Sequence, residues 1–598
     1  MTDRRSALRA LAATTIAPLL PACGTAPPRP DTFGRGGHDA AIKWLGALIR
    51  REMDDAGIAG LSIALLDGQR LIHAEGFGVA DKAAGRPAAA HTRYRAGSIS
   101  KVFTVAAAMQ MVEAGTLDLD APLTDVLPDF SIRTRGPAVA AITPRMLMTH
   151  HSGLPSDRIE GMWRDNPLHF PSLVTAMHDE YRAFPPDFIH AYSNLGFSLL
   201  GAAIERIAGM PFERHMRERL LLPLGMENSA FDTRPPGDTQ AYDAQGHAGN
   251  EPALRDSPAG GLNTSAPELL QLARMIFAQG DMAGGRVLGP ASLAEMARPQ
   301  NAGCALDADL RVGLGWHFAP DAVRGGGPVL SHDGGTLHHH SALMLLPEHR
   351  LAVAVLSNSA NAARLVNRLA GTALGLLLEV KTGIRQPTGP IPAQADPRFP
   401  PARPEAIAGF YDTPTGFAEI RRDGDRLQLR IGDRQLDVRP RPDGYLGLEY
   451  RILGLFPVSI GPLGELAFTL ASISGREVLL ARQSGGFFVA GERMAAVPVP
   501  EAWRARLGTY RYVGGDAFLA GRIGVTELAL EDGFLVAVST AAEGIQKLAL
   551  APVGDDEAVI RGLGRGRGDT VHVRAGHDGE RLHYAGMVFQ RATGAAAS

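Results

Sequence analysis

The stretch that decides the fold is YRAGSISKVFTVAAAMQMVEAG at residues 94–115. Its second half is an alanine-rich run that Gly115 should stop, which predicts a helix. Ser98 and Lys101 stand one helical turn apart at the start of that helix. This spacing puts both side chains on one face, where the lysine amine can reach the serine hydroxyl. The alternative is a helix-capping serine beside a solvated lysine, which the spacing alone does not exclude.

Lysine is rare in this chain, so each one is informative. Only five of the 60 basic residues are lysines, and 55 are arginines. The 598 residues carry a formal net charge of −3, with 21% charged and 45% hydrophobic residues. Such a balance is typical of a folded protein without a nucleic-acid partner, and the length predicts several domains. The two cysteines, Cys23 and Cys304, exclude a disulfide framework and argue against a cysteine-built zinc site.

A second motif, Tyr192-Ser193-Asn194, lies in a predicted loop just before the apolar helix LGFSLLGAAIERIAG at 195–209. Polar turns of this composition also occur for purely structural reasons. The motif nevertheless stands at the mouth of a helix, as the pair formed by Ser98 and Lys101 does.

Together and in this order, the two motifs resemble the serine β-lactamase and D-alanyl-D-alanine carboxypeptidase superfamily, particularly its class C-like, esterase and D-aminopeptidase branches. The resemblance covers roughly 45–380 and includes GTLDLD at 115–120, MTHHSGLP at 148–155 and GGL at 260–262. It implies an α+β domain with an antiparallel sheet flanked by helices and a helical lobe. Predicted strands at both ends of a helical middle independently suggest one sheet built from distant segments.

The superfamily carries a third motif, Lys-Thr-Gly or His-x-Gly, on an inner strand, and several stretches match it. Lys381-Thr382-Gly383 follows the last predicted helix and runs into a proline-rich linker, so no strand carries it. His577-Asp578-Gly579 lies in a β domain, where a hairpin turn is expected. His-x-Gly also occurs at His151 and His247. Only His332-Asp333-Gly334 follows an apolar strand and precedes two more strands and a helix, so we predict His332 as the third-motif residue.

The resemblance then implies roles for the matched residues. Ser98 would be the nucleophile, and Lys101 and Tyr192 would share proton transfer, with the general base left open between them. Asn194 would orient the substrate amide. His332 would line the opposite wall of the site and interact with Tyr192 or the leaving group.

An oxyanion hole is expected from the backbone N–H groups of Ser98 and Gly335, with Gly334 also lining the substrate site. Neither a cofactor nor a metal is expected. The run His338-His339-His340 offers imidazoles but no carboxylate or cysteine partner set for a metal. We expect these histidines to rim the cleft beside His332 or to occupy a solvated strand start.

The first 23 residues, MTDRRSALRALAATTIAPLLPAC, predict an export signal. Arg4-Arg5 resembles a twin-arginine pair, and LPAC at 20–23 resembles a lipoprotein cleavage box, which implies lipidation of Cys23. The alternative is ordinary cleavage nearby with an inert cysteine. We expect a linker at 24–38 and an exported, periplasmic lipoprotein that meets the membrane only through its lipid anchor, because no later apolar run approaches the ~20 residues of a spanning helix.

Composition divides the rest of the chain. Residues 39–383 form the predicted hydrolase domain, and seven prolines within 387–404 indicate a linker over 384–404. The segments 405–497 and 498–598 open alike, with Gly409-Phe410-Tyr411 and Gly508-Thr509-Tyr510 ninety-nine residues apart. Both continue with period-two alternation around Asp-Gly hairpin signals. We predict two similar, small, all-β, barrel-like domains.

Three functions follow for this layout. The first is a serine hydrolase that acts on an amide or ester, with D-amino-acid peptides as candidate substrates in a D-aminopeptidase or carboxypeptidase-like reaction. The second is a carboxylesterase or β-lactamase-like activity at the same site. The third is a penicillin-binding-like sensor that keeps the fold without turnover. The expected partner is thus a small peptide, amide or ester; stereochemistry and oligomeric state do not follow from the sequence.

Overall fold

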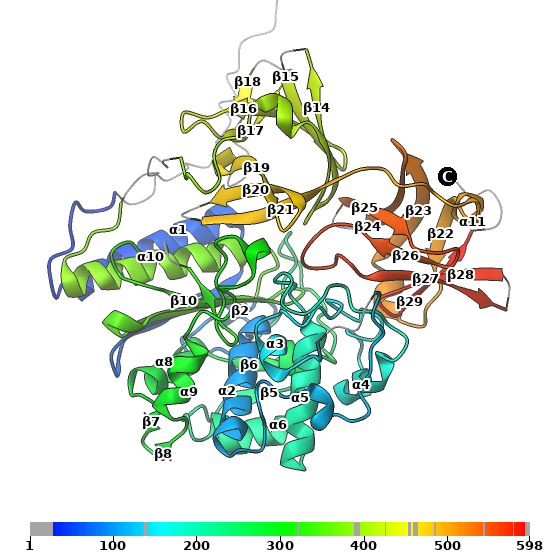
Figure 1. The fold of residues 1–598 in the computed structure, drawn as a ribbon. Coiled ribbons are helices and arrows are strands. Elements are labelled where there is room, and N and C mark those ends of the chain that lie inside the picture. Colours follow the sequence, from blue (N-terminus) through cyan, green and yellow to red (C-terminus); the bar gives the residue numbers. More distant parts are fainter. Residues whose placement is uncertain are drawn as a thin grey trace, which may run out of the picture.

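The computed structural model describes residues 28–136, 140–319, 322–387, 395–424, 426–452, 456–458, 464–483, 486–541, 544–577 and 579–592. Figure 1 shows a large helix-and-sheet domain at the N-terminal side of the chain and two smaller β domains. The predicted export signal, including Cys23, lies outside the described residues.

A seven-stranded antiparallel sheet forms the centre of the N-terminal domain, in the order β3-β2-β1-β12-β11-β10-β9. Strand β1 from the start of the domain pairs with β12 from its end, with Ile63 opposite Val355. The sheet is therefore assembled from distant segments, as the sequence predicts. Its strands are β1 (Gly60–Asp67), β2 (Arg70–Asp81), β3 (Arg86–Pro87), β9 (His317–Phe318), β10 (Leu330–Gly335), β11 (His340–Leu346) and β12 (Leu351–Ser357).

Helices cover both faces of this sheet, so β1 and β12 are almost continuously apolar. Ile63 and Val353 pack into the cluster formed with α1 (His38–Ala56) and α10 (Ala363–Thr382). Their neighbours Ala64 and Ala354 belong to the cluster on the other side, under the helical lobe. Alternate side chains of one strand thus fill two separate cores.

The helical lobe is inserted between β3 and β9. Eleven of the fourteen residues of α2 are buried, so its alanines allow neighbouring helices to approach closely from several directions. The lobe contains α2 (Ser100–Glu113), α3 (Pro144–Met148), α4 (Leu173–Ala176), α5 (Asn194–Ala208), α6 (Phe212–His215), a π-helical turn (Met216–Leu221), α7 (Ser257–Gly260), α8 (Ala266–Phe277) and α9 (Pro290–Met296), with the short strands β4 (Tyr94–Arg95), β5 (Ala230–Phe231), β6 (Leu262–Thr264), β7 (Asp281–Met282) and β8 (Gly285–Arg286).

The first β domain is an eight-stranded barrel that the pairing of β16 with β17 closes, with β18 added at the edge of β17. Its strands are β13 (Gly409–Thr413), β14 (Gly416–Asp423), β15 (Arg426–Ile431), β16 (Arg434–Pro440), β17 (Leu446–Ile452), β18 (Phe456–Val458), β19 (Ala467–Ile473), β20 (Arg476–Gln483) and β21 (Gly486–Met494). Buried side chains from several of these strands, among them Tyr411, Ile420 and Leu479, form a core within this small domain.

The second β domain is also a closed eight-stranded barrel. Its strands are β22 (Gly508–Tyr512), β23 (Ile523–Glu531), β24 (Phe534–Ala541), β25 (Gly544–Pro552), β26 (Glu557–Ile560), β27 (Thr570–Gly576), β28 (Gly579–Tyr584) and β29 (Met587–Arg591), with the short helices α11 (Glu501–Ala505) and α12 (Ala517–Ala520).

The same tyrosine anchor opens both barrels. The Tyr411 hydroxyl donates to the carbonyl of Ile407 at 2.7 Å, and the Tyr510 hydroxyl donates to the carbonyl of Arg506 at 2.8 Å. Each tyrosine is buried and lies on the first strand of its barrel. The repeated Gly-x-Tyr is therefore a repeated structural device.

Within the described ranges, no single helix is long and apolar enough to cross a membrane. Helix α5 and the segment Phe212–Leu221 meet the length and composition test only as a pair bent by 75°. Helix α5 belongs to the core of the helical lobe, where most of its residues are buried.

Candidate active site

A tight turn presents Ser98 at the start of α2. Gly97 has a φ of 54°, and a Cβ on this residue would lie 2.7 Å from the backbone nitrogen of Gly335. Only glycine fits such a conformation and such an approach. Ser98 follows in a 3₁₀ turn, Gly97–Ile99, and is half-buried, whereas Ile99 and Ser100 are buried. The turn therefore leaves the Ser98 hydroxyl accessible on an otherwise closed segment.

Lys101 is fully buried and lies beside Ser98. Its Nζ atom is 3.2 Å from Oγ of Ser98, 2.7 Å from Oδ1 of Asn194 and 2.8 Å from the carbonyl oxygen of Ala259. The amide oxygen of Asn194 and the carbonyl of Ala259 can only accept hydrogen bonds. A neutral amine has two N–H groups for these acceptors and one lone pair left for the Ser98 hydroxyl.

The surroundings favour the neutral amine. Burial lowers the pKa of Lys101 well below its usual value, and the positive charge of Arg565 lowers it further. Nearby carboxylates, among them Asp157, oppose this shift without outweighing it. This shift favours the neutral amine, which is the form that a base for Ser98 requires.

Tyr192 and Asn194 are held at the N-terminus of α5. The Ser193 side chain caps this helix by accepting a hydrogen bond from the Gly196 N–H at 3.0 Å. The Ser193 N–H donates to Nδ1 of His150, whose ring lies 4.2 Å from the Tyr192 ring between centroids. This cap fixes the direction of both motif side chains.

The tyrosine ring lies against the lysine. Nζ of Lys101 is 4.7 Å from the centroid of the Tyr192 ring. Burial raises the pKa of Tyr192, while a hydrogen bond with Ser98 partly offsets this effect. The phenol therefore stays protonated at neutral pH and can pass a proton but not begin by taking one.

His332 lies on β10, on the wall opposite α5, and is 3% exposed. Its Nδ1 is 2.6 Å from the carbonyl oxygen of Asp333, so Nδ1 carries the hydrogen and Nε2 keeps its lone pair. Burial lowers the pKa of His332 well below its usual value, and His317 and Lys101 lower it further. The third-motif position thus holds a neutral imidazole.

A row of buried and half-buried histidine rings continues from this residue toward Tyr192. Centroids are 5.2 Å apart for His332 and His317, 5.7 Å for His317 and His190, and 5.4 Å for His190 and His150. Burial lowers the pKa of each ring. Four imidazole rings with lowered pKa values therefore lie between β10 and α5.

The two glycines after His332 bring β10 close to the serine turn. A Cβ on Gly334 would lie 1.9 Å from the carbonyl oxygen of Ala96, so a side chain cannot be placed there. Gly335 is exposed, and its backbone nitrogen lies against Gly97. The backbone of Gly335 and the turn that carries Ser98 therefore face one another, as an oxyanion hole requires.

The competing third-motif matches lie elsewhere. Lys381 is in the last turn of α10 and pairs with Asp67 of β1. His577 follows β27 in the turn that leads to β28, where Gly576 pairs with Gly579. Neither is placed on an inner strand beside Ser98.

The expectation of a solvated strand start at His338-His339-His340 is wrong. His338 and His339 are 6% and 0% exposed, because Nδ1 of His339 is 2.9 Å from the buried carboxylate of Glu251. Glu251 also accepts from Arg95, at 3.1 Å. Burial alone would raise the pKa of Glu251, but His339, His338 and Arg95 outweigh it and hold the pKa well below its usual value. The sequence carries no spacing signal for this network.

One buried group of metal-ligand type lies near the histidine row. Side-chain atoms of His151, Cys304 and Asp307 lie within 4.8 Å of one another. Both oxygens of Asp307 already accept hydrogen bonds, one from the His190 N–H and the other from His151 and Asn301. This carboxylate is satisfied by protein donors and serves to hold the rings in place.

Two site residues have no counterpart among the sequence motifs. Asp157 accepts from Nδ2 of Asn194 at 2.7 Å, and Arg565 of the second barrel pairs with Asp157 at 3.1 Å. Spacing gives no signal for Asp157. Arg565, however, lies in RGLGRGRGD at 561–569, and four alternating glycines with positive φ mark that loop as unusual.

The chain matches a known protein family in both sequence and fold. The β-lactamase family profile matches residues 45–375. Penicillin-binding protein 4 of Amycolatopsis lactamdurans is 30% identical over 374 residues, covering 60% of this chain and 94% of that protein. Esterase EstB of Burkholderia gladioli is 27% identical over 35% of this chain and 55% of its own length. The crystal structure of SurE aligns with a TM-score of 0.54 at 24% identity, covering 76% of this chain and 100% of that one, which shows a shared fold.

Proposed function

Because the chain belongs to the β-lactamase family of hydrolases, we propose that it forms an acyl-enzyme on Ser98 and hydrolyses an amide or an ester. The observation that carries this proposal is the contact between Ser98 and Lys101. The amine is buried, two acceptors lie within hydrogen-bond distance of its nitrogen, and that nitrogen is 3.2 Å from Oγ of Ser98, so a neutral amine can take the serine proton. This arrangement favours Lys101 over Tyr192 as the base that activates the serine.

The reaction proceeds in two halves. In the first, Oγ of Ser98 attacks the carbonyl carbon and its proton passes to Lys101. The N–H groups of Ser98 and Gly335 stabilise the oxyanion, and one such donor is typically worth about 3 kcal/mol. When the intermediate collapses, the C–N or C–O bond breaks and the leaving group takes the proton by way of the Tyr192 hydroxyl. In the second half, water attacks the acyl-enzyme and releases the acid and free Ser98.

For the substrate we propose an amide or ester of small size, with D-amino-acid peptides as the first class to test, in a D-aminopeptidase or carboxypeptidase-like reaction. The relationship to a protein named for penicillin binding supports a site that can accept a penicillin. The relationship to EstB supports the second candidate, a carboxylesterase or β-lactamase-like reaction. A sensor that becomes acylated without turnover uses the same serine and is separated from both by kinetics.

The test begins with covalent labelling. The full chain is exposed to a fluorophosphonate and, separately, to a penicillin, and the adduct is located by intact mass and peptide mapping. Modification of Ser98, absent in Ser98→Ala, is expected. Turnover is then measured on D- and L-amino-acid amides, p-nitrophenyl esters and a cephalosporin. Modification at another residue would overturn the proposal, and labelling without any turnover would favour the sensor.

We also propose that the chain is exported and lipid-anchored at Cys23, on the basis of the N-terminal sequence. Metabolic labelling with a palmitate analogue is expected to modify the wild-type protein and not Cys23→Ser. Recovery of the Cys23→Ser protein in the soluble periplasmic fraction is the expected companion result. Equal membrane association of both proteins would contradict the anchor.

A further inference from the structure

A loop of the second barrel reaches the active site of the N-terminal domain. Residues 561–569 connect β26 to β27 and carry glycine at every second position. The Gly566 N–H donates to the Ser156 hydroxyl at 2.7 Å, next to Asp157. A Cβ on Gly568 would lie 2.4 Å from the carbonyl oxygen of Ala183. The alternating glycines therefore allow this backbone to lie directly on the helical lobe.

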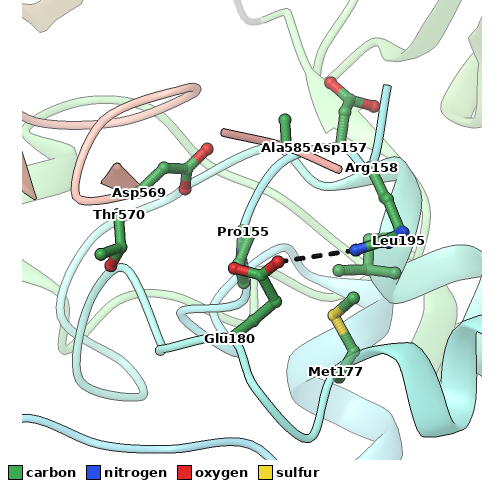
Figure 2. Close-up of a pocket in the computed structure, with 9 residues that line it drawn as sticks. All are labelled: Pro155, Asp157, Arg158, Met177, Glu180, Leu195, Asp569, Thr570 and Ala585. Atoms are coloured by element: carbon green, nitrogen blue, oxygen red, sulfur yellow. Dashed lines mark ion pairs between the residues drawn. The ribbon is translucent and has the colours of Figure 1, made fainter. Parts of the chain in front are cut away.

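Figure 2 shows the adjoining face of the same contact. Asp569 and Thr570 of the second barrel line a pocket together with Pro155, Asp157 and Glu180 of the helical lobe. Arg158 pairs with Glu180 across this pocket at 3.5 Å. The loop thus follows a continuous interface between the two domains and is not an isolated projection.

The first barrel also holds the loop. Arg567 is 4% exposed in its side chain and pairs with the buried carboxylate of Asp412 on β13. It also donates to the carbonyl of Thr413 at 2.6 Å. Two buried partners on the neighbouring barrel fix the residue two positions after Arg565, so Arg565 is presented on a braced backbone.

Arg565 itself faces the catalytic residues. Nη2 lies 3.1 Å from Oδ2 of Asp157, whose other oxygen accepts from Asn194. The guanidinium carbon is 5.0 Å from the centroid of the Tyr192 ring. The Arg565 side chain is 55% exposed, so part of the guanidinium faces solvent at the mouth of the site.

The charges around the site make this arginine distinctive. Burial lowers the pKa values of both Lys101 and His332, which weakens their tendency to carry a positive charge. Arg565 is permanently charged. Asp157 occupies one edge of its guanidinium, and within the described part of the chain no second acceptor is recorded for the remaining N–H groups. The planar guanidinium group of Arg565, with N–H groups still available to donate, is suited to binding a carboxylate.

We propose that Arg565 binds a carboxylate group of the substrate, so that the second barrel supplies a specificity-determining residue to the active site of the N-terminal domain. This inference rests on the proposed function, since it assigns a substrate class to the site of Ser98. Among D-amino-acid peptides it selects those with a free carboxylate over those that offer only a free amine. It also gives the interdomain contact a catalytic purpose, because removal of the barrel removes the carboxylate subsite.

A purely structural role for Arg565 makes a different prediction. If the arginine only neutralises Asp157 or tunes Lys101, its loss changes all substrates equally. The exposed carboxylate of Asp333, which acts on Lys101 and Tyr192, would favour a substrate amine if it governed recognition instead. The test therefore compares ligands that differ only in the carboxylate.

The experiment measures protection of Ser98 from a fluorophosphonate probe. Two competitors are used: an N-acetylated D-dipeptide with a free C-terminal carboxylate, and the same dipeptide as its carboxamide. For the wild-type chain we expect the carboxylate to protect at a concentration at least about tenfold lower, on the scale of one charge-assisted hydrogen bond. In Arg565→Gln this ratio should fall to near one, and Arg565→Lys should keep part of it.

The control is Arg511→Gln, which removes an exposed arginine from β22 of the same barrel and should keep the wild-type ratio. Because the ratio compares two competitors in one protein, slower labelling of a variant does not affect it. An equal ratio in wild type and Arg565→Gln would overturn the proposal, as would protection by neither peptide or by both equally in the wild type. Failure of the probe to modify Ser98 at all would instead contradict the proposed function.

Discussion

The Nζ atom of Lys101 lies 2.7 Å from Oδ1 of Asn194, although 93 residues separate them in the chain. One residue opens α2 and the other opens α5, so the contact joins the two helix starts that carry the motifs. Because the amide oxygen can only accept, it takes one N–H of the amine and so helps to hold the nitrogen beside Ser98. The contact between Lys101 and Asn194 therefore joins the two motifs in one site.

Replacement of Lys101 by arginine should remove at least about 99% of kcat/KM, since a positioned base contributes on the order of a hundredfold or more. Arginine keeps the charge but does not release its proton at working pH. Ester turnover is measured together with a thermal melt. Lys43→Arg, an exposed lysine on α1, is the matched control and should retain full activity. An active Lys101→Arg variant would contradict the assignment of the base.

His332→Ala should lower kcat by at least about tenfold, the scale expected for the loss of a positioned proton-transfer group. Lys381→Ala and His577→Ala should leave kcat nearly unchanged, because they lie in the last turn of α10 and in a hairpin turn. Circular dichroism confirms that the variants are folded. Strong loss at Lys381 with none at His332 would show that the inner strand has been misplaced.

The pH profile of kcat/KM should show an acid limb that reports Lys101. Burial and Arg565 lower its pKa, so the neutral amine persists below its ordinary range and activity falls only as pH drops through the lowered value. In Arg565→Gln one of these causes is removed, so the pKa of Lys101 rises and the acid limb moves to higher pH. A neutral ester serves as substrate, and an unshifted limb would contradict the electrostatic link.

Tyr411→Phe and Tyr510→Phe should each destabilise their barrel by about 1–2 kcal/mol, because each leaves a buried carbonyl without its donor. The measurement is the shift of the urea unfolding transition followed by fluorescence. Turnover at low urea should be unchanged in both variants, since neither tyrosine contacts the catalytic residues. A shift in one variant and not in the other would show that the two anchors are not equivalent.

Asp569→Asn should stabilise the native chain at neutral pH. Burial, together with the carboxylates of Asp157 and Glu180 in the same pocket, raises the pKa of Asp569 to about 8 (Figure 2). The native state then binds this proton more tightly than the unfolded chain does, so the contribution of Asp569 to stability falls as pH rises from about 4 to about 8. The gain in Tm of the variant should grow across that range and level off above it. A constant difference in Tm from pH 4 to pH 9 would contradict this shift.

Local patterns gave correct predictions wherever the cause is local. Ser98 and Lys101 lie one turn apart, across the 3₁₀ turn that leads into α2, and the Asp-Gly signals at Asp423 and Asp532 lie where paired strands meet. A helical rise and a two-residue turn depend on adjacent residues, so the sequence determines them. The sheet of β1 and β12 was also foreseeable, because buried apolar strands at both ends of a domain have to find one another.

Two features depend on the tertiary structure alone: the pKa shifts of buried side chains and the contacts between residues that lie far apart in the chain. The pKa of Lys101 is lowered because the helical lobe buries it, and desolvation by a fold has no signature in the spacing of residues. His339 is buried on Glu251, 88 residues away, although its triplet suggested a solvated strand. Arg565 reaches Asp157 from another domain, 408 residues along the chain. Such contacts depend on how separately folded units pack, and a sequence specifies that packing only through the surfaces it creates.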